Sequence, residues 1–283
     1  MLSYRHAFHA GNHADVLKHA VLVALLRHMV RKEKPFTVID THAGAGAYGL
    51  DAGYAAKNAE WADGIARLWN MPDLPALLAD YVELVRGMNP AGQPTFYPGS
   101  PYLASKLLRR DDRLRLFELH PTDVDLLGKT FKDAGRQVSV TRGDGLAGLK
   151  ASLPPPSRRG LALIDPSYED KRDYANVLEA LRDGLKRFAT GTYMLWYPVL
   201  ARVEAQRLPA RLHGLEAEWL DVRLHVARPS TDGLGMTGSG LFLINPPYTL
   251  EADLRTALPV LAQMLGMDGA GRFEMETSAG KAS

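Results

Sequence analysis

The stretch from Phe36 to Gly49 (FTVIDTHAGAGAYG) constrains the fold of this 283-residue chain most strongly. A short β-branched run, Phe36 to Asp40, stops at a turn that contains Gly44 and Gly46. A strand followed at once by a tight glycine turn is how a doubly wound α/β domain begins. The turn lacks the G-x-G-x-x-G spacing of a dinucleotide site, and no Gly-Lys-Ser/Thr phosphate loop is present. A plain strand–helix connection also explains Gly-x-Gly, so the turn alone is weak evidence for a ligand.

Later runs have the composition of β-strands, and apolar residues recur between them every three or four positions, as in Tyr174–Phe188. These runs are Leu114–Glu118, Gln137–Thr141, Gly160–Asp165, Thr192–Tyr197, Trp219–Val226 and Gly240–Asn245. With the first run they make seven strands, which predict an α/β fold with a mostly parallel sheet and helices on both faces. We expect the tail from Gly271 onward to be frayed.

One interval of the predicted domain is abnormally long. In a compact α/β unit, the acid that binds a ribose follows the glycine turn by about 20 residues, whereas Glu118 lies far beyond Gly46. We therefore predict that residues 51–95 form a small helical insertion, a second lobe beside the sheet. The main domain would consist of residues 1–50 and 96–283, with an N-terminal motif and helix in residues 1–35.

Acidic residues stand at the ends of successive predicted strands, and such strand ends form the crevice where open α/β sheets bind ligands. Glu118 ends the second strand, and Asp144 with Gly145 follows the third. A ligand with a ribose but no pyrophosphate fits this pattern, and S-adenosylmethionine is such a ligand. Asp40 and the glycine turn would face its methionine end. Glu118 would accept from the ribose hydroxyls and Asp144 from the adenine amine.

Two similar pentapeptides close apolar runs: IDPSY (Ile164 to Tyr168) and INPPY (Ile244 to Tyr248). Asp/Asn-Pro-Pro-Tyr after a strand is typical of enzymes that methylate an exocyclic amine. Asp165 and the Pro166 carbonyl would accept hydrogen bonds from the amine, and Tyr168 would stack on an extruded base. A strand-ending turn with an Asx-type hydrogen bond is the alternative interpretation of Asp-Pro-Ser.

The expected strand order distinguishes the two pentapeptides. In the strand order of a doubly wound α/β sheet, the first and fourth strands flank the switch point where ligands bind. Asp165 ends the fourth strand, whereas Asn245 ends the last. We assign the chemistry to Asp165 and a structural turn to Asn245.

Composition limits the remaining possibilities. The chain has no cysteine, which excludes disulfides and thiolate chemistry and suits a cytoplasmic enzyme. We expect no membrane span and no secretory signal, because long apolar runs are absent and the N-terminus is polar. The net charge of +2 does not by itself indicate nucleic acid. Basic residues do cluster, either as phosphate-binding patches or as solvated helix faces: Arg27, Arg31, Lys32 and Lys34; Lys106, Arg109, Arg110, Arg113 and Arg115; Arg158 and Arg159.

The N-terminal residues hold five of the nine histidines: His6, His9, His13, His19 and His28. No H-E-x-x-H pattern or carboxylate pairing accompanies them, so we expect no metal. Asn12 or Asp15 would cap a helix with an apolar face. Lys18 and His19 on this helix would lie near the charged end of the cofactor if the helix packs over the crevice.

Several motifs together resemble a known family. MLSYRHAFHAGNHADVLKH, DTHAGAG, YPGSP, ELHP and RFATG are similar to those of the bacterial 23S rRNA adenine-N6 methyltransferase family, over nearly the whole chain. The resemblance implies a Rossmann-like methyltransferase domain with a helical insertion and S-adenosylmethionine as methyl donor. It also implies 23S rRNA as partner, either protein-free or in an early assembly intermediate. We expect a monomer.

The resemblance also implies roles for single residues. The cofactor contacts would be Lys18, His19, His42, Gly44, Ser100, Glu118, Asp144, Gly145 and Asp165. Asp165 would be catalytic with Pro166 and Tyr168, and Tyr4 and His6 would meet the RNA. Ser167 departs from the family, which has proline there, and this puts the rate in doubt.

Two rival functions remain. A DNA adenine methyltransferase would share the tetrapeptide, but nothing in the sequence resembles a major-groove reading module. A cofactor-retaining RNA-binding or assembly protein that has lost catalysis is suggested only by Ser167. Methyl incorporation into naked rRNA, compared with duplex DNA, would distinguish the DNA enzyme. Turnover with transcribed rRNA fragments would distinguish the non-catalytic protein.

Overall fold

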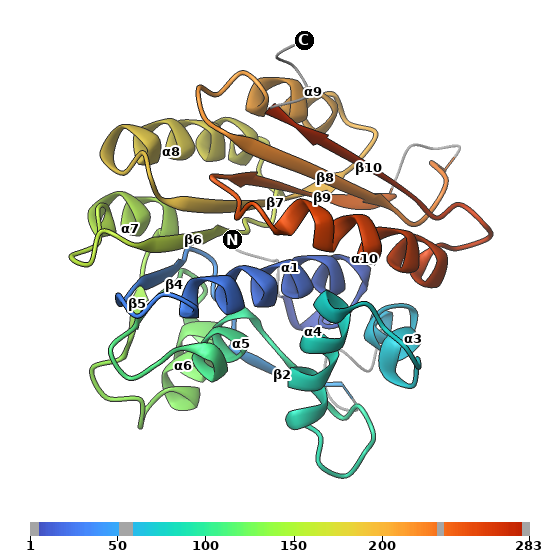
Figure 1. Ribbon diagram of the computed structural model, residues 1–283, viewed down its shortest axis with the longest axis horizontal. Helices are drawn as coiled ribbons and strands as arrows, with labels where there is room; N and C mark the ends of the chain where they lie inside the picture. The colour runs from blue at the N-terminus through green and yellow to red at the C-terminus, as the bar shows by residue number, and fades with distance from the viewer. Residues whose placement is uncertain (1–5, 51–58, 231–234, 279–283) are drawn as a thin grey trace.

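The computed structural model describes residues 6–50, 59–230 and 235–278 (Figure 1). Its strands are β1 (Thr37–Asp40), β2 (Ala47–Gly49), β3 (Phe96–Pro98), β4 (Arg113–Glu118), β5 (Val138–Arg142), β6 (Gly160–Ile164), β7 (Thr192–Val199), β8 (Trp219–His225), β9 (Gly238–Ile244) and β10 (Arg272–Thr277). Its helices are η1 (His6–Phe8), α1 (His13–Val30), η2 (Glu60–Asp63), α3 (Ile65–Trp69), α4 (Ala76–Gly87), α5 (Ser100–Leu107), α6 (Pro121–Thr130), α7 (Gly145–Ser152), α8 (Asp173–Arg187), α9 (Val203–Leu212) and α10 (Leu250–Leu265).

The main sheet has eight strands in the order β10-β8-β9-β7-β6-β1-β4-β5. The strands from β7 to β5 run parallel, and β9, β8 and β10 extend the sheet with antiparallel pairs. All seven predicted strands are present, and the α/β class is confirmed. The predicted frayed tail is wrong for Arg272–Thr277, which forms the edge strand β10. Residues 279–283 lie outside the described residues. Arg223 of β8 forms ion pairs with Glu274 and Glu276 of β10. These contacts exist only when the two strands are paired in the folded sheet.

A hydrophobic cluster packs on each face of the sheet. Along β6, Leu161 and Leu163 face the cluster that contains α1, α4, α5 and α10. Ala162 and Ile164 face the cluster that contains α8 and α9. The alternation follows from the pleat of a strand. The result is a sheet covered by helices on both faces, as in a Rossmann-like fold.

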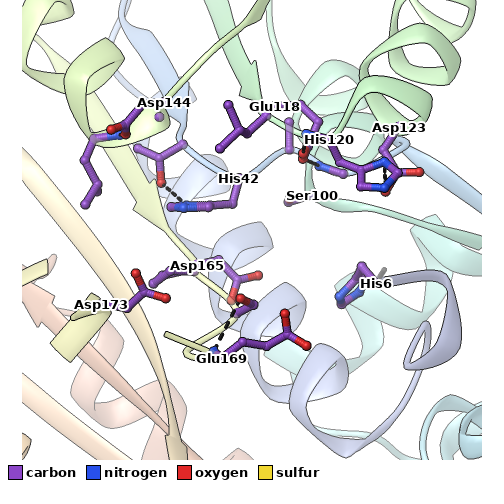
Figure 2. A pocket seen from close by; sticks show the side chains of 18 of the residues that line it. His6, His42, Ser100, Glu118, His120, Asp123, Asp144, Asp165, Glu169 and Asp173 are labelled. Atoms are coloured by element: carbon purple, nitrogen blue, oxygen red, sulfur yellow. Dashed lines mark hydrogen bonds and ion pairs between the residues drawn. The ribbon is translucent and has the colours of Figure 1, made fainter. Parts of the chain in front are cut away.

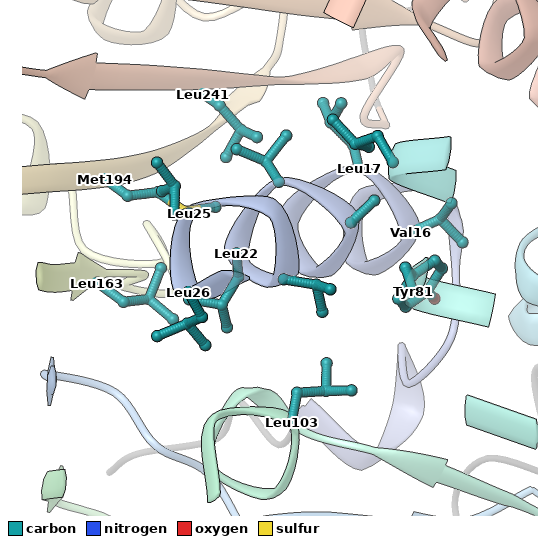
Figure 3. Packing of buried hydrophobic residues seen from close by; sticks show 14 of the residues in the cluster. Val16, Leu17, Leu22, Leu25, Leu26, Tyr81, Leu103, Leu163, Met194 and Leu241 are labelled. Carbon is teal, nitrogen blue, oxygen red and sulfur yellow. The ribbon is translucent and has the colours of Figure 1, made fainter. Parts of the chain in front are cut away.

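Helix α1 is buried on almost every side, which places polar residues inside the protein. Figure 3 shows its leucines packed against Leu163 and Met194 of the sheet and against Leu103 of α5. A helix that is hydrophobic all round is typical of a buried one. Asn12 caps it by accepting from the backbone N–H groups of Ala14 and Asp15, as predicted. No helix in the described ranges is long and apolar enough to cross a membrane.

The inserted interval is helical but does not form a separate lobe in its described part, residues 59–95. Its helices η2, α3 and α4 pack against α1 and α10. Leu78, Tyr81 and Val82 of α4 belong to the same hydrophobic cluster as the leucines of α1. Residues 51–58 lie outside the described residues. The interval therefore contributes to the main core, and its removal would expose α1.

A two-stranded sheet brings the two ends of the interval together. Strand β2 pairs antiparallel with β3, and the N–H of Gly99 donates to the carbonyl of Gly46 at 2.9 Å. Helix α5 begins immediately afterwards, at Ser100. This pairing places Ser100 beside the glycine turn, although the two are far apart in the sequence.

The strand order separates the two pentapeptides. Strand β1 lies between β6 and β4, so Asp165 follows a strand at the switch point. Strand β9 runs antiparallel to β7, and its last residue, Ile244, pairs with Tyr193 near the start of β7. Asn245 is therefore at the opposite edge of the sheet from Asp165. The predicted separation of Asp165 and Asn245 is confirmed. Its cause is that β9 runs in the opposite direction to β6 and β7.

Candidate active site

One pocket of about 940 Å³ opens at the carboxyl ends of the parallel strands (Figure 2). Loops after β1, β4, β5 and β6 line it, together with the N-terminal stretch and the start of α5. The predicted site residues that line it are His6, Lys18, His19, His42, Gly44, Ser100, Glu118, Asp144, Gly145, Asp165 and Pro166. Tyr4 lies outside the described residues. The fold thus gathers residues from six separate segments into one site, and their individual roles remain predictions.

The glycine turn is held against the end of β4. Gly44 and Gly46 have φ angles of +60° and +82°, a left-handed conformation that side chains rarely adopt. The N–H of Gly44 donates to Oε2 of Glu118 at 2.8 Å. A Cβ on Gly44 would lie 2.2 Å from the Tyr48 hydroxyl. The turn therefore needs glycine for its own packing, and it orients Glu118.

The two strand-end acids are oriented by backbone amides. Glu118 also accepts from the N–H of His120 through Oε1 at 2.7 Å. Asp144 is the N-cap of α7 and accepts from Leu146 and Ala147. Both carboxylates are thus fixed, with further acceptor capacity toward the pocket. This arrangement suits hydroxyl and amine donors of a nucleoside.

A buried acid lies beneath the pocket at the end of β1. Asp40 is 2% exposed and accepts from the Ser100 hydroxyl through Oδ2 at 2.7 Å. Its Oδ1 accepts from the N–H of His42 at 3.2 Å. Burial raises the pKa of Asp40 to about 7, against the opposing effect of the Ser100 hydrogen bond. Asp40 therefore fixes Ser100 and the first residues of the turn.

The buried carboxylate of Asp15 organises the N-terminal side of the site. The sequence alone indicated only a possible helix cap at this position. Asp15 is fully buried and accepts from the Gly11 N–H at 2.9 Å. Its oxygens also contact Nε2 of His6 and Nζ of Lys18, each at 2.9 Å. Burial opposes ionisation, but His6 and Lys18 hold the pKa of Asp15 well below its usual range. A signal was available: Asp15 and Lys18 are one turn apart on a helix whose other residues are mostly apolar.

Lys18 joins this network to the pentapeptide IDPSY. Its Nζ lies 2.6 Å from Oδ2 of Asp165, across 147 positions of sequence. Burial alone would lower the pKa of Lys18, but the carboxylates of Asp15 and Asp165 raise it above its ordinary value. Lys18 therefore stays charged and fixes the orientation of Asp165. Among the hydrogen bonds of the described residues, Oδ1 of Asp165 has none, so this oxygen can accept from a ligand.

Tyr168 does not face the pocket. Its side chain is 2% exposed, its hydroxyl donates to the Trp196 carbonyl at 2.9 Å, and its ring packs on Tyr174. The residue has a φ of +55°, which turns its ring into the core. The prediction that Tyr168 stacks on a base is wrong. Ser167 and Glu169, its neighbours, line the pocket instead.

We expect Tyr168→Phe to lower stability and leave methyl transfer per folded molecule unchanged. The hydroxyl contributes one buried hydrogen bond, whose loss costs about 1 kcal/mol in the free energy of unfolding. The ring and its packing on Tyr174 remain. Urea unfolding together with single-turnover kinetics tests this. A large rate loss with unchanged stability would instead place the hydroxyl in the reaction.

Asn245 occupies a structural turn. Its side-chain Nδ2 donates to the carbonyls of Ala189 and Gly191, both at 2.7 Å. Its φ of +51° is one that asparagine tolerates better than most residues. The structural assignment of Asn245 is confirmed.

Acidic residues beyond the predicted set also line the pocket. They are Asp123, Glu169, Asp170 and Asp173. Asp123 lies in the first turn of α6 and Asp173 begins α8, whereas Glu169 and Asp170 lie in the loop that follows β6. With Glu118, Asp144 and Asp165, they give the pocket an acidic lining that favours cations.

Three of the N-terminal histidines form side-chain hydrogen bonds within the protein. His6 pairs with Asp15, His9 with Glu60, and His19 with the hydroxyl of Tyr97. Elsewhere His213, Asp221 and Glu276 approach one another within 4.8 Å. Arg223 contacts both of those carboxylates, so a guanidinium already supplies the positive charge there.

Two pocket histidines predict a loss of stability in acid. Burial lowers the pKa of His19 to about 3 and that of His42 to about 4, from an ordinary value of 6.5. The unfolded chain therefore takes up these protons first, so stability is full above pH 6.5 and falls as the pH drops toward 4. Asp40 acts in the opposite sense, because its raised pKa costs stability as the pH rises through 7.

We expect His19→Asn to shrink the difference in unfolding free energy between pH 7 and pH 5. Asp40→Asn should enlarge that difference, since it removes the opposing titration. Urea unfolding at both pH values measures it. An unchanged difference in His19→Asn would contradict the assignment of the slope to this residue.

Comparison with known proteins agrees with this geometry. Residues 33–277 match the family model described as ribosomal RNA large subunit methyltransferase D, RlmJ. The chain is 49% identical to the ribosomal RNA large subunit methyltransferase J of Escherichia coli K12 over 275 residues, 96% of each chain. It is 46% identical to the protein of the same name from Haemophilus influenzae over 280 residues, 98% of each chain.

A solved structure shares the whole architecture. A crystal structure of a protein from Legionella pneumophila matches with a TM-score of 0.86 and 36% identity. The match covers 95% of this chain and 98% of that one. The chain therefore belongs to the ribosomal RNA large subunit methyltransferase J family.

Proposed function

We propose that this protein transfers a methyl group from S-adenosylmethionine to the N6 amine of an adenine in 23S rRNA. The substrate would be protein-free rRNA or an early assembly intermediate. The observation that carries the proposal is Asp165, which ends the strand at the switch point, lines the pocket and is oriented by Lys18. The family membership supports the reaction and the substrate class.

The residues of the pocket fit S-adenosylmethionine. A volume of about 940 Å³ is ample for a nucleoside with an amino-acid arm. Glu118 would accept from the ribose hydroxyls and Asp144 from the adenine amine. Ser100, His19 and His42 also line the pocket, and the amino-acid arm would lie against them and the glycine turn. The acidic lining matches the positive ammonium and sulfonium groups of the ligand.

When bound, S-adenosylmethionine supplies an electrophilic methyl group on a positively charged sulfur. The chain must make the adenine amine nucleophilic, because its lone pair is delocalised into the ring. Asp165 Oδ1 and the Pro166 carbonyl would accept from the two N–H bonds and favour a pyramidal nitrogen. Lys18, already bound to Oδ2, holds the carboxylate in position for this task. Asp165 then stabilises the positive charge that develops on the amine.

The RNA side of the pocket is the N-terminal stretch. His6 lines the pocket and is tied to the buried Asp15, so its ring is held at the opening. With Tyr168 in the core, His6 and Tyr4 remain as the proposed contacts to the flipped base. Ser167 lines the pocket without displacing Asp165 or Pro166, so the proposed reaction class stands.

The test is methyl incorporation with three substrates in parallel. Protein-free 23S rRNA, assembled large subunits and duplex DNA are incubated with the purified protein and S-adenosylmethionine. Mass spectrometry of the digested nucleosides then identifies the product. We expect N6-methyladenosine from naked rRNA and little from the other two. Preferential methylation of duplex DNA would support the DNA enzyme, and cofactor binding without turnover on rRNA would support the non-catalytic alternative.

A further inference from the structure

Three basic clusters that are separate in the sequence meet at one edge of the sheet. Strands β1, β4 and β6 begin side by side, with Thr37 opposite both Arg113 and Gly160. The segments that precede these strands therefore converge. They are residues 31–34, 109–113 and 158–159, which we call the basic edge.

Two arginines of the basic edge hold the segments together. Arg109 Nη1 donates to the Lys32 carbonyl at 2.8 Å, and Arg159 Nη2 donates to the Met29 carbonyl at 2.7 Å. Both guanidinium groups lie over the Phe36 ring, 5.8 and 5.6 Å from its centre. These two side chains are structural.

The other basic residues of the edge are exposed. They are Arg31, Lys32, Lys34, Arg110, Arg113 and Arg158. The three segments contain eight basic and three acidic side chains, whereas the whole chain has a net charge of only +2. One of these acids, Asp112, is buried against Arg109. Positive charge is thus concentrated at this edge, and the rest of the protein is net negative.

The pocket lining does not provide a net positive charge that would attract the phosphates of RNA. Seven carboxylates and three cationic side chains line it: Glu118, Asp123, Asp144, Asp165, Glu169, Asp170 and Asp173, against Lys18, Lys171 and Arg172. Carboxylates repel a phosphate backbone, and affinity for RNA depends on neutralising phosphates with Lys and Arg. Because the lining is net negative, a phosphate-binding surface outside the pocket is favoured.

An exposed aromatic ring lies beside the basic edge. Tyr248, in the INPPY turn at the same edge of the sheet, is 87% exposed. Its ring meets that of His28 edge-on at 6.2 Å. The backbone N–H of Arg31 donates to the His28 carbonyl, and Arg159 donates to the carbonyl of the adjacent Met29, so His28 lies next to the basic edge. An exposed aromatic among cations is the composition of a single-stranded nucleic-acid platform.

We propose that the basic edge and Tyr248 form a second RNA-binding surface, for an unpaired segment of the rRNA away from the target adenine. Lysines and arginines would neutralise its phosphates, and Tyr248 would stack on one of its bases. The surface and the pocket are separated by the length of the strands, about 15–20 Å. This inference rests on the proposed rRNA substrate.

The experiment compares two triple variants with equal charge change. Lys32→Gln/Arg110→Gln/Arg158→Gln removes exposed charges of the basic edge. Arg182→Gln/Arg207→Gln/Arg211→Gln removes exposed charges from α8 and α9 and is the control. Equilibrium binding to a long 23S rRNA fragment is measured at several salt concentrations, and S-adenosylmethionine affinity confirms that each variant is folded.

We expect the basic-edge variant to bind the long fragment at least tenfold more weakly. Each single-strand phosphate contact contributes about 0.7 to the slope of log affinity against log salt. Because three charges are removed, the slope of the basic-edge variant should be smaller by about 2. KM for the long fragment should rise while kcat stays unchanged, and a short fragment around the target should show no difference. Tyr248→Ala should weaken binding by about 5- to 100-fold, with Tyr248→Leu equally weak and Tyr248→Phe near wild type.

Two results would overturn the inference. One is a basic-edge variant that binds the long fragment as tightly as the control variant does. The other is an equal loss on the short and long fragments. Failure of the proposed function gives a different pattern, because the unaltered protein itself would then neither methylate nor prefer the rRNA.

Discussion

Replacing Asp165 with alanine is expected to lower the single-turnover rate of methyl transfer by at least about 10²-fold, as loss of an electrostatic stabiliser does. Asp165 lies at the switch point, and its interaction with the amine is strongest when positive charge develops on nitrogen. Cofactor binding should survive, because the other expected contacts remain. The fold should persist, because Lys18 keeps its second carboxylate, Asp15, at 2.9 Å. Quenched-flow methylation of an rRNA fragment measures the rate.

Asn245→Ala is the matched control for this prediction. Asn245 ends a strand in the other pentapeptide, but it lies at the opposite edge and its amide serves two carbonyls. Its replacement should cost about 1–3 kcal/mol of stability and leave turnover per folded molecule nearly unchanged. A well-folded but inactive Asn245→Ala, beside an active Asp165→Ala, would show that the chemistry belongs to INPPY.

Gly145→Ala is expected to cause the second large effect, on the structure and on the cofactor site together. A Cβ at Gly145 would lie 1.7 Å from the Thr41 carbonyl oxygen and 2.5 Å from its carbon. These are backbone atoms at the end of β1, so α7 would have to move away from the sheet. We expect a loss of at least about 3 kcal/mol, a drop of roughly 6–12 °C in Tm for a chain of this size. S-adenosylmethionine affinity should fall as well.

Gly143→Ala tests whether the close approach of a Cβ to Thr41 causes the losses expected for Gly145→Ala. Gly143 lies in the same β5–α7 connection, but a Cβ there would meet nothing within 4 Å. We expect its Tm and cofactor affinity to stay near those of the unaltered protein. Equal losses in both variants would mean that the connection needs glycine for flexibility, and the close approach to Thr41 would not be the reason.

Much of the site followed from local patterns along the chain. The glycine turn, Glu118, Asp144 and Asp165 each directly follow or end a β-type run. In a parallel sheet, all such strand ends meet at one edge, so sequence position alone was enough to bring them together. The choice of Asp165 over Asn245 needed only the expected strand order. Short sequence patterns therefore specify well which residues lie at the strand ends that line a ligand site.

The sequence by itself therefore determined the α/β class, the seven predicted strands and the edge at which the site lies. Only the tertiary structure decided which way side chains point and which distant segments touch. A left-handed turn buries Tyr168, α4 packs on α1 where a separate lobe was expected, and β10 pairs with β8. Asp15 and Lys18 reach Asp165 through a buried helix. Such contacts depend on packing between elements remote in sequence, and the free energy of that packing is not encoded in any local pattern.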